Sequence, residues 1–312
     1  MAGKAALTII IPTNENDLDI LEGALNSALW ADEILLVDSS FSDKVKNKAR
    51  EYGAKYLAHH YVYSAKQKNW AIPKSKNKWV FILDSDEIIT TKLQKTLRQI
   101  LQSKELLKKF RGFGVARKHF FFGKFLRFGG RYPLYNIRFF HKACRYEDRD
   151  VHAHIILKKN LVRNIPYQQG DLLHFSDRTY GQFFRRFDRY SDYQANYLKK
   201  IAEKKIGIDL VQFFSNFYYF KAIMKDIWFF IPGAPFLRFF YMYVIRLGFL
   251  DGRSGLTIAL LYGLQDYVSK TKFYQLVDKY PENRLKLEVF FRDKLLNWIF
   301  PEKKFLSGKL EN

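Results

Sequence analysis

Short apolar runs alternate with segments of helical periodicity over the first hundred residues of the chain. The runs that predict strands are Leu7–Ile11, Glu33–Val37, Ala54–Ala58 and Trp79–Leu83, and the segments that predict helices are Asp19–Trp30, Ser42–Tyr52 and Ser64–Ile72. This alternation is typical of a parallel, right-handed, doubly wound α/β sheet with helices on both faces. In such a sheet, ligands bind beyond the carboxyl ends of the strands.

The polar residues that stand out follow these predicted strands. Pro12–Glu15 comes after the first strand, Asp38 ends the second, and Asp84 and Asp86 come after the fourth. Residues two apart in extended backbone point the same way, so these last two carboxylates can converge on one ion, and their oxygens suit Mg²⁺ or Mn²⁺. A polar loop that caps the next helix is the alternative for an isolated Asp-x-Asp pair. Convergence on one sheet edge favours a nucleotide site, with Asp38 placed to accept a hydrogen bond from a ribose or base.

From Gly181 onward the pattern becomes helical, and residues 211–250 are strongly apolar and aromatic. Charged residues and two prolines, Pro232 and Pro235, interrupt that stretch, so it does not predict a membrane-spanning helix. Basic residues among aromatic ones fit helices that lie in a membrane interface, and we expect Trp228, Phe229 and Phe230 to enter it. A helical layer packed on the first domain is the alternative. We predict two domains, 1–180 and 181–312.

Composition narrows the possible partners of the chain. Among 312 residues, 53 Lys and Arg against 31 Asp and Glu give a formal charge of +22, which indicates an anionic partner such as nucleic acid, an acidic membrane or a phosphorylated substrate. Cys144 is the lone cysteine, which excludes an internal disulfide and a Cys-based zinc site. The residues before Leu7 hold no apolar core for a secretion signal, so we expect a cytoplasmic protein.

Several ordered motifs together resemble those of the family 2 glycosyltransferases with a GT-A fold. They are IIPTNE at 10–15, WADEILLVDS at 30–39, AKQKN at 65–69, WVFILDSDE at 79–87, GGRYP at 129–133, NIRFF at 136–140, VH at 151–152 and GFLDGR at 248–253. The series is similar to the subgroup that contains lipopolysaccharide-core glucosyltransferases. The resemblance implies a Rossmann-like, mostly parallel sheet flanked by helices, with a helical carboxyl-terminal extension.

The resemblance also implies roles for individual residues. The donor, a nucleotide-diphosphate sugar and by expectation a UDP-sugar, would be bound by Pro12, Thr13, Asn14, Glu15, Asp38, Lys66, Gln67, Asn69, Asp84 and Ser85. Asp84 and Asp86 would hold Mg²⁺ or Mn²⁺, with Glu87 either supporting them or capping the next helix. For Lys66 and Lys68, an ordinary solvated helix face is the alternative. Within the aromatic and basic stretch 110–138, Arg131, Tyr132 and Arg138 match family motifs and are candidates for acceptor or phosphate contacts.

The candidate catalytic base is where the chain departs from the family pattern. The family's inverting displacement needs a carboxylate to take the acceptor's proton. Relatives often have Val-His-Glu where this chain has Val151-His152-Ala153. Glu147, Asp148 and Asp150 lie just upstream and could substitute, with Asp150 preferred because it adjoins the motif. A surface turn in which these acids form salt bridges with Arg145 and Arg149 is the alternative. His152 or His154 could complete the metal shell, and a histidine that is merely hydrogen-bonded is the alternative for either.

The sequence therefore predicts an inverting, metal-dependent glycosyltransferase. Its acceptor would be a cell-surface glycan, a lipopolysaccharide core or a lipid-linked sugar at the cytoplasmic face of an anionic membrane. A basic nucleic-acid-binding protein is the first alternative, but zinc spacing, an RNP-like motif and a low-complexity basic tail are all missing from the sequence. A transferase-like scaffold without catalysis is the second, suggested by the missing glutamate after His152 and opposed by the intact Asp84 and Asp86.

Overall fold

The computed structural model describes residues 5–148, 153–177, 179–203, 228, 231 and 233–278. The chain forms two compact units, which we describe separately. The first comprises Met1–Phe183 together with Met242–Leu256, and the second comprises Phe184–Tyr241 and Thr257–Asn312. The first unit thus includes a returning segment of the chain that lies far beyond the predicted boundary at residue 180.

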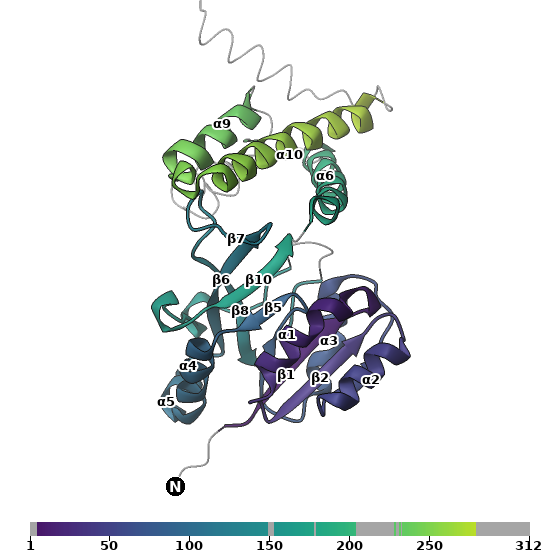
Figure 1. The fold of residues 1–312 in the computed structure, drawn as a ribbon, viewed down its shortest axis with the longest axis vertical. Coiled ribbons are helices and arrows are strands. Elements are labelled where there is room, and N and C mark those ends of the chain that lie inside the picture. Colours follow the sequence, from purple (N-terminus) through teal and green to yellow (C-terminus); the bar gives the residue numbers. More distant parts are fainter. Residues whose placement is uncertain are drawn as a thin grey trace, which may run out of the picture. The chain divides into compact units, whose positions relative to one another are not determined.

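The first unit is built on one mixed sheet (Figure 1). Its strands are β1 (Leu7–Thr13), β2 (Glu33–Asp38), β3 (Lys55–Ala58), β4 (Trp79–Ile82), β5 (Glu87–Ile89), β6 (Gly112–Phe121), β7 (Lys124–Phe125), β8 (Leu134–His141), β9 (Val162–Asn164) and β10 (Leu172–Asp177). They lie in the order β3-β2-β1-β4-β8-β6-β10-β5, with β7 and β9 paired to β6. The four strands predicted from the apolar runs pair in parallel, which confirms that part of the sheet. Beyond β4 the sheet is mixed, because β8 pairs antiparallel with both β4 and β6.

Helices cover both faces of this sheet, as predicted (Figure 1). They are α1 (Leu18–Ala28), α2 (Asp43–Glu51), α3 (Ser64–Ala71), α4 (Thr91–Gln102) and α5 (Lys104–Lys109). Alternate residues of β1 serve the two layers: Ile9 packs in the cluster that contains the buried residues of α1, α2 and α4, and Ile10 packs with Ala65 and Ala71 of α3. Burial on both faces explains why these strands are continuous apolar runs.

Short helical turns complete the first unit. They are η1 (Glu15–Asp17), η2 (Ile72–Lys74), η3 (Lys159–Leu161), η4 (Tyr167–Gln169) and η6 (Gly248–Asp251), and the π-helical turn η5 (Tyr241–Ile245) leads into the returning segment. The turn η6 contains the first four residues of the GFLDGR motif at 248–253.

The described part of the second unit is helical, as predicted for the carboxyl-terminal third. It comprises most of α6 (Tyr180–Glu203) and α10 (Arg253–Asp278), together with α9 (Ala234–Phe240). Ala195 and Leu198 of α6 pack with Phe273 of α10, and Lys272 bonds to Asp188 at 2.6 Å. None of the described helices is long and apolar enough to cross a membrane. Of the three residues expected in a membrane interface, Trp228 is half-buried, and Phe229 and Phe230 lie outside the described residues.

Candidate active site

The polar residues predicted to converge do so at the carboxyl edge of the parallel strands. Thr13 ends β1 and is the register partner of Asp38, which ends β2. Leu83, directly after β4, donates its N–H to the carbonyl of Ile10, which brings the following acids to the same edge. The carboxyl ends of β1, β2 and β4 therefore lie at one edge, which is where a parallel sheet binds its ligands.

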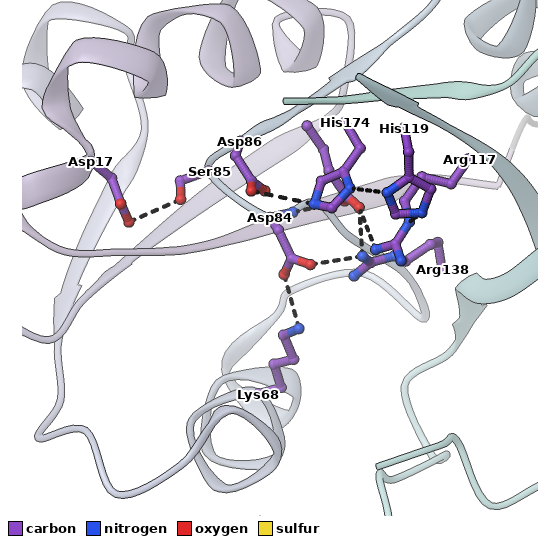
Figure 2. Close-up of polar contacts among 10 residues, drawn as sticks. Asp17, Lys68, Asp84, Ser85, Asp86, Arg117, His119, Arg138 and His174 are labelled. Carbon is purple, nitrogen blue, oxygen red and sulfur yellow. Dashed lines mark hydrogen bonds and ion pairs between the residues drawn. The ribbon is translucent and has the colours of Figure 1, made fainter. Parts of the chain in front are cut away.

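Asp84 is held between two cations (Figure 2). Its Oδ1 lies 2.8 Å from Nζ of Lys68, and its Oδ2 lies 2.7 Å from Nη2 of Arg138. Burial alone would raise the pKa of Asp84, but Arg138 and Lys68 hold it well below its usual range. Lys68 is only 8% exposed, so the solvated helix face considered for it is wrong. Burial favours its neutral form, yet Asp84 keeps the pKa of Lys68 above its ordinary value.

Glu87 lies at the centre of this charged cluster. It is fully buried, accepts the N–H of Asp84 at 3.1 Å, and pairs with Arg138 at 2.6 Å and Arg117 at 3.3 Å. The cap of the next helix is Thr90, which accepts the N–H of Leu93, so the suggestion that Glu87 caps that helix is wrong. Glu87 instead fixes the backbone of the Asp-x-Asp turn. Arg138 is almost completely buried among the acids, and its predicted contact with acceptor or phosphate stays a prediction.

Asp86 has a different partner, His174 of β10, which in turn contacts His119 of β6 (Figure 2). His174 Nε2 lies 3.3 Å from Asp86 Oδ2, and Nδ1 of the same ring lies 2.9 Å from Nδ1 of His119. His119 in turn accepts from Nε of Arg117 at 3.2 Å. Burial would raise the pKa of Asp86, but the hydrogen bond from His174 lowers it below its ordinary value. Sequence reasoning missed both histidines, although His174, like Asp84, follows an apolar run.

The donor set fits a divalent cation at Asp86 better than at Asp84. Both oxygens of Asp84 already contact cations, whereas Asp86 and His174 place a carboxylate and an imidazole side by side, a combination that Mn²⁺ accepts readily. Across the described residues there is no cluster of three or more His, Cys, Asp or Glu side chains suited to a metal. Water and donor phosphates would have to complete the shell. His152, the predicted third ligand, lies outside the described residues.

Ser85 and Asn14 are joined through an acid that the sequence did not single out. Ser85 Oγ donates to Asp17 Oδ2 at 2.9 Å (Figure 2), and Asn14 Nδ2 donates to the same carboxylate at 2.9 Å. Burial raises the pKa of Asp17 above its ordinary value, with Asp86 adding to the effect. Asp17 therefore ties the loop after β1 to the Asp-x-Asp turn.

Asp38 organises the loop after β2 from inside. Its carboxylate is fully buried and accepts from Ser40 N at 2.8 Å, Ser42 N at 2.8 Å and the Tyr56 hydroxyl at 2.9 Å. Phe41, between the two serines, is forced to φ 56, a region that bulky residues avoid, and its exposed ring packs 4.4 Å from that of His60. The expected direct contact between Asp38 and the nucleotide stays a prediction.

The neighbouring loop after β1 is tied to this one. The N–H of Glu15 donates to Ser40 Oγ at 2.9 Å, and the exposed Glu15 carboxylate pairs with Lys44 at 2.7 Å. Thr13 is buried at the end of β1, next to the half-buried Pro12. Their predicted nucleotide contacts also stay predictions.

Helix α3 carries three further donor-site candidates, and they differ in exposure. Gln67 is buried beneath the sheet edge, and Asn69 brackets the backbone of Tyr146, accepting its N–H at 2.8 Å and donating to its carbonyl at 3.0 Å. Lys66 is exposed, with its ammonium 5.3 Å from the centre of the Tyr63 ring. Of these three residues, Lys66 is the charged one, and its exposed ammonium is accessible to a diphosphate.

Two of the three candidate bases are described. Asp148 is exposed and accepts a hydrogen bond from the Tyr63 hydroxyl. Glu147 is half-buried, and its backbone N–H donates to the carbonyl of His154 at 2.9 Å. Arg145, the proposed salt-bridge partner in the alternative, donates to the carbonyl of Cys144 at 2.8 Å. Asp150, the preferred candidate, lies outside the described residues.

Tyr132 and Arg131 lie in the loop before β8. The Tyr132 hydroxyl donates to Asp171 at 2.8 Å, and Lys118 pairs with the same carboxylate at 3.1 Å. Burial, followed by the hydrogen bond to Asp171, raises the pKa of Tyr132. Arg131 is half-buried in the same loop. Their assignment to the acceptor stays a prediction.

Comparison with known proteins finds a matching family model and a similar curated protein. Residues 8–156 match the model of the family described as Glycosyl transferase family 2. An uncharacterized glycosyltransferase of Rickettsia bellii (strain RML369-C) is 33% identical over 90 residues, a region that covers 28% of this chain and 31% of that protein. The matching region thus spans less than a third of that curated relative's length.

Solved structures with a similar arrangement include that of S. aureus TarS 1-349, with 12% sequence identity and a TM-score of 0.42 over 89% of this chain and 92% of that one. The same protein in complex with UDP-GlcNAc gives 12% identity and a TM-score of 0.44 over 93% and 92% of the two chains.

Proposed function

We propose that the chain, whose residues 8–156 match the model of glycosyl transferase family 2, moves a sugar from a nucleotide-diphosphate donor, expected to be a UDP-sugar, with inversion at the anomeric carbon. The acceptor we propose is a cell-surface glycan, a lipopolysaccharide core or a lipid-linked sugar at the cytoplasmic face of the membrane. The observation that carries the proposal is the meeting of Asp84, Asp86 and His174 beside the ends of β1 and β2.

Each part of the donor has a candidate partner at this edge. The exposed ring of Phe41 offers a surface on which a nucleobase can stack, next to the loop shaped by Asp38. The ammonium of Lys66 lies on the solvent side of α3, where it can meet the diphosphate. Asp86 and His174 would hold Mn²⁺ or Mg²⁺, which when bound stabilises negative charge on the leaving diphosphate.

The charged cluster around Asp84 has a positioning role in this proposal. Lys68, Arg138 and Glu87 fix the carboxylate of Asp84 and the backbone N–H that starts the turn. That rigidity keeps Asp86 in one orientation before the donor arrives, so little reorganisation accompanies the reaction. In the chemical step, a carboxylate near the acceptor takes the hydroxyl proton as the acceptor oxygen attacks the anomeric carbon, and the bond from that carbon to the diphosphate oxygen breaks, which releases the nucleoside diphosphate.

A donor screen tests the proposal directly. The full chain should release nucleoside diphosphate slowly from one class of nucleotide sugar, by hydrolysis to water, when Mn²⁺ or Mg²⁺ is present. Chelation with EDTA should stop the release, and restoring the metal should recover it. A screen of UDP-, GDP-, ADP- and dTDP-sugars in which none is hydrolysed and none binds would contradict the proposed function.

The base is tested with three amide substitutions, Glu147→Gln, Asp148→Asn and Asp150→Asn. We expect one of them, most plainly Asp150→Asn, to lower the rate of transfer by about a hundredfold or more while nucleotide binding is retained, because only proton transfer is lost. Turnover measured with saturating donor, beside the dissociation constant for UDP, separates the two effects. Near-normal turnover in all three variants would place the base elsewhere in the chain.

A further inference from the structure

A short segment of the first unit exposes an unusual amount of apolar surface. We call residues 244–250 the apolar ridge. Its large side chains are between 39% and 58% exposed, and they are Val244, Ile245, Leu247, Phe249 and Leu250. Scattered apolar residues are normal on a protein surface, but five large ones exposed within seven positions concentrate apolar surface in one turn, and such concentrations mark binding surfaces.

The ridge is a firmly built turn. Leu247 has φ 58, and a Cβ on Gly248 would lie 2.6 Å from the carbonyl oxygen of Met242, so the chain is closely packed at its bend. The carboxylate of Asp251 accepts the N–H of Phe128 at 2.9 Å, and Gly129 donates its N–H to the carbonyl of Arg246 at 2.9 Å. These bonds fasten the ridge to the loop that follows β7, in the same unit as the Asp-x-Asp turn. Its apolar side chains are therefore held outward by the fold.

The described charged side chains that are exposed in the ridge and in the segment that holds it are basic. Arg246 and Arg253 are exposed in and beside it, Lys124 is exposed in β7, and Arg127 is exposed in the loop to which the ridge is fastened. In the sequence 241–256, Asp251 is the one acidic residue. It is buried, and its carboxylate accepts a hydrogen bond from the loop after β7. An apolar centre with a cationic rim complements an anionic lipid surface, in which apolar side chains enter the acyl boundary and basic ones meet the headgroups.

We propose that the apolar ridge docks the first unit on an anionic lipid bilayer. This inference goes beyond sugar transfer, since docking needs neither donor nor acceptor. It also moves the expected membrane contact from residues 228–230 to residues 244–250. A ridge fastened to the catalytic unit, unlike a flexible tail, would hold the sheet edge at a fixed distance from the bilayer, which suits an acceptor that diffuses in the membrane.

Vesicle flotation of the full chain tests the inference. The parent protein should float with vesicles containing about 30% phosphatidylglycerol, float less at high salt, and float poorly with pure phosphatidylcholine. The variant Ile245→Ser/Leu250→Ser should lower partitioning into the acidic vesicles about a hundredfold. Each substitution removes one apolar side chain from the lipid, and that loss lowers the partition coefficient about tenfold. Both side chains are exposed, so its thermal unfolding should match that of the parent.

A matched control replaces two apolar side chains of similar relative exposure elsewhere in the first unit. Leu29 and Val62 of the first unit are 54% and 59% exposed, and Leu29→Ser/Val62→Ser should float as the parent does. Equal flotation of the ridge variant and the parent would overturn the inference, as would a parent that stays in solution with acidic vesicles at low salt. A ridge variant that instead lowers the mass measured by light scattering would identify a contact between two copies, which also overturns it. Nucleotide release in the absence of vesicles is independent of all these outcomes, so the failure of docking and the failure of the proposed function are distinguishable.

Discussion

Asp86→Asn should lower the rate of sugar transfer by about a hundredfold or more in a protein that remains folded. The amide keeps the size of the side chain but removes the negative charge that, beside His174, would hold the divalent cation. The leaving diphosphate then loses its main charge compensation. Turnover should be measured across a titration of Mn²⁺, because a weakened metal site also raises the concentration needed for half-maximal activity.

Glu105→Gln supplies the control, since Glu105 is an exposed acid in the first turn of α5. It should leave both turnover and the Mn²⁺ requirement unchanged. If Asp86→Asn retained the parent's turnover and the parent's Mn²⁺ requirement, the metal assignment would be wrong. Loss of turnover with an unchanged Mn²⁺ requirement would instead give Asp86 a role in binding the donor without metal.

The sequence predicts the parallel half of the sheet well because β1, β2 and β4 are buried on both faces. Leu7–Ile11 and Trp79–Leu83 are continuous apolar runs for that reason, and the helices between them have regular apolar spacing. The pairing of β8 between β4 and β6 has no such local signal, since it joins residues far apart in the chain. Local periodicity identifies a strand but does not identify its neighbours.

The same distinction explains what the sequence reveals about the site. Asp84 and Asp86 stand out because acids end an apolar run, and their placement at the sheet edge follows from the parallel topology. Their different partners could not be read in this way. Lys68 belongs to α3 and His174 to β10, and both reach the turn only through tertiary packing. A lysine on a short helix normally predicts solvent exposure, and only the acid opposite it makes burial favourable.

Arg138→Met should make the first unit less stable by about 3–5 kcal/mol in its free energy of unfolding. Methionine fills part of the volume but leaves the fully buried Glu87 with Arg117 as its remaining cation, at the longer distance of 3.3 Å. A buried charge without a partner is costly because it loses its hydration and gains no equivalent interaction in the low-dielectric interior. Urea unfolding of the full chain, followed by intrinsic fluorescence, gives the change.

Two further variants show whether the loss comes from the unpaired charge. Arg117→Met removes a more exposed and more distant partner of Glu87 and should cost only about 1 kcal/mol. Adding Glu87→Gln to Arg138→Met should recover part of the loss, because the glutamine carbonyl can still accept the N–H of Asp84 while the buried charge is gone. In a double-mutant cycle the two substitutions should therefore couple strongly. Additive losses would mean that Arg138 stabilises the unit through its packing or through Asp84, and not by neutralising Glu87.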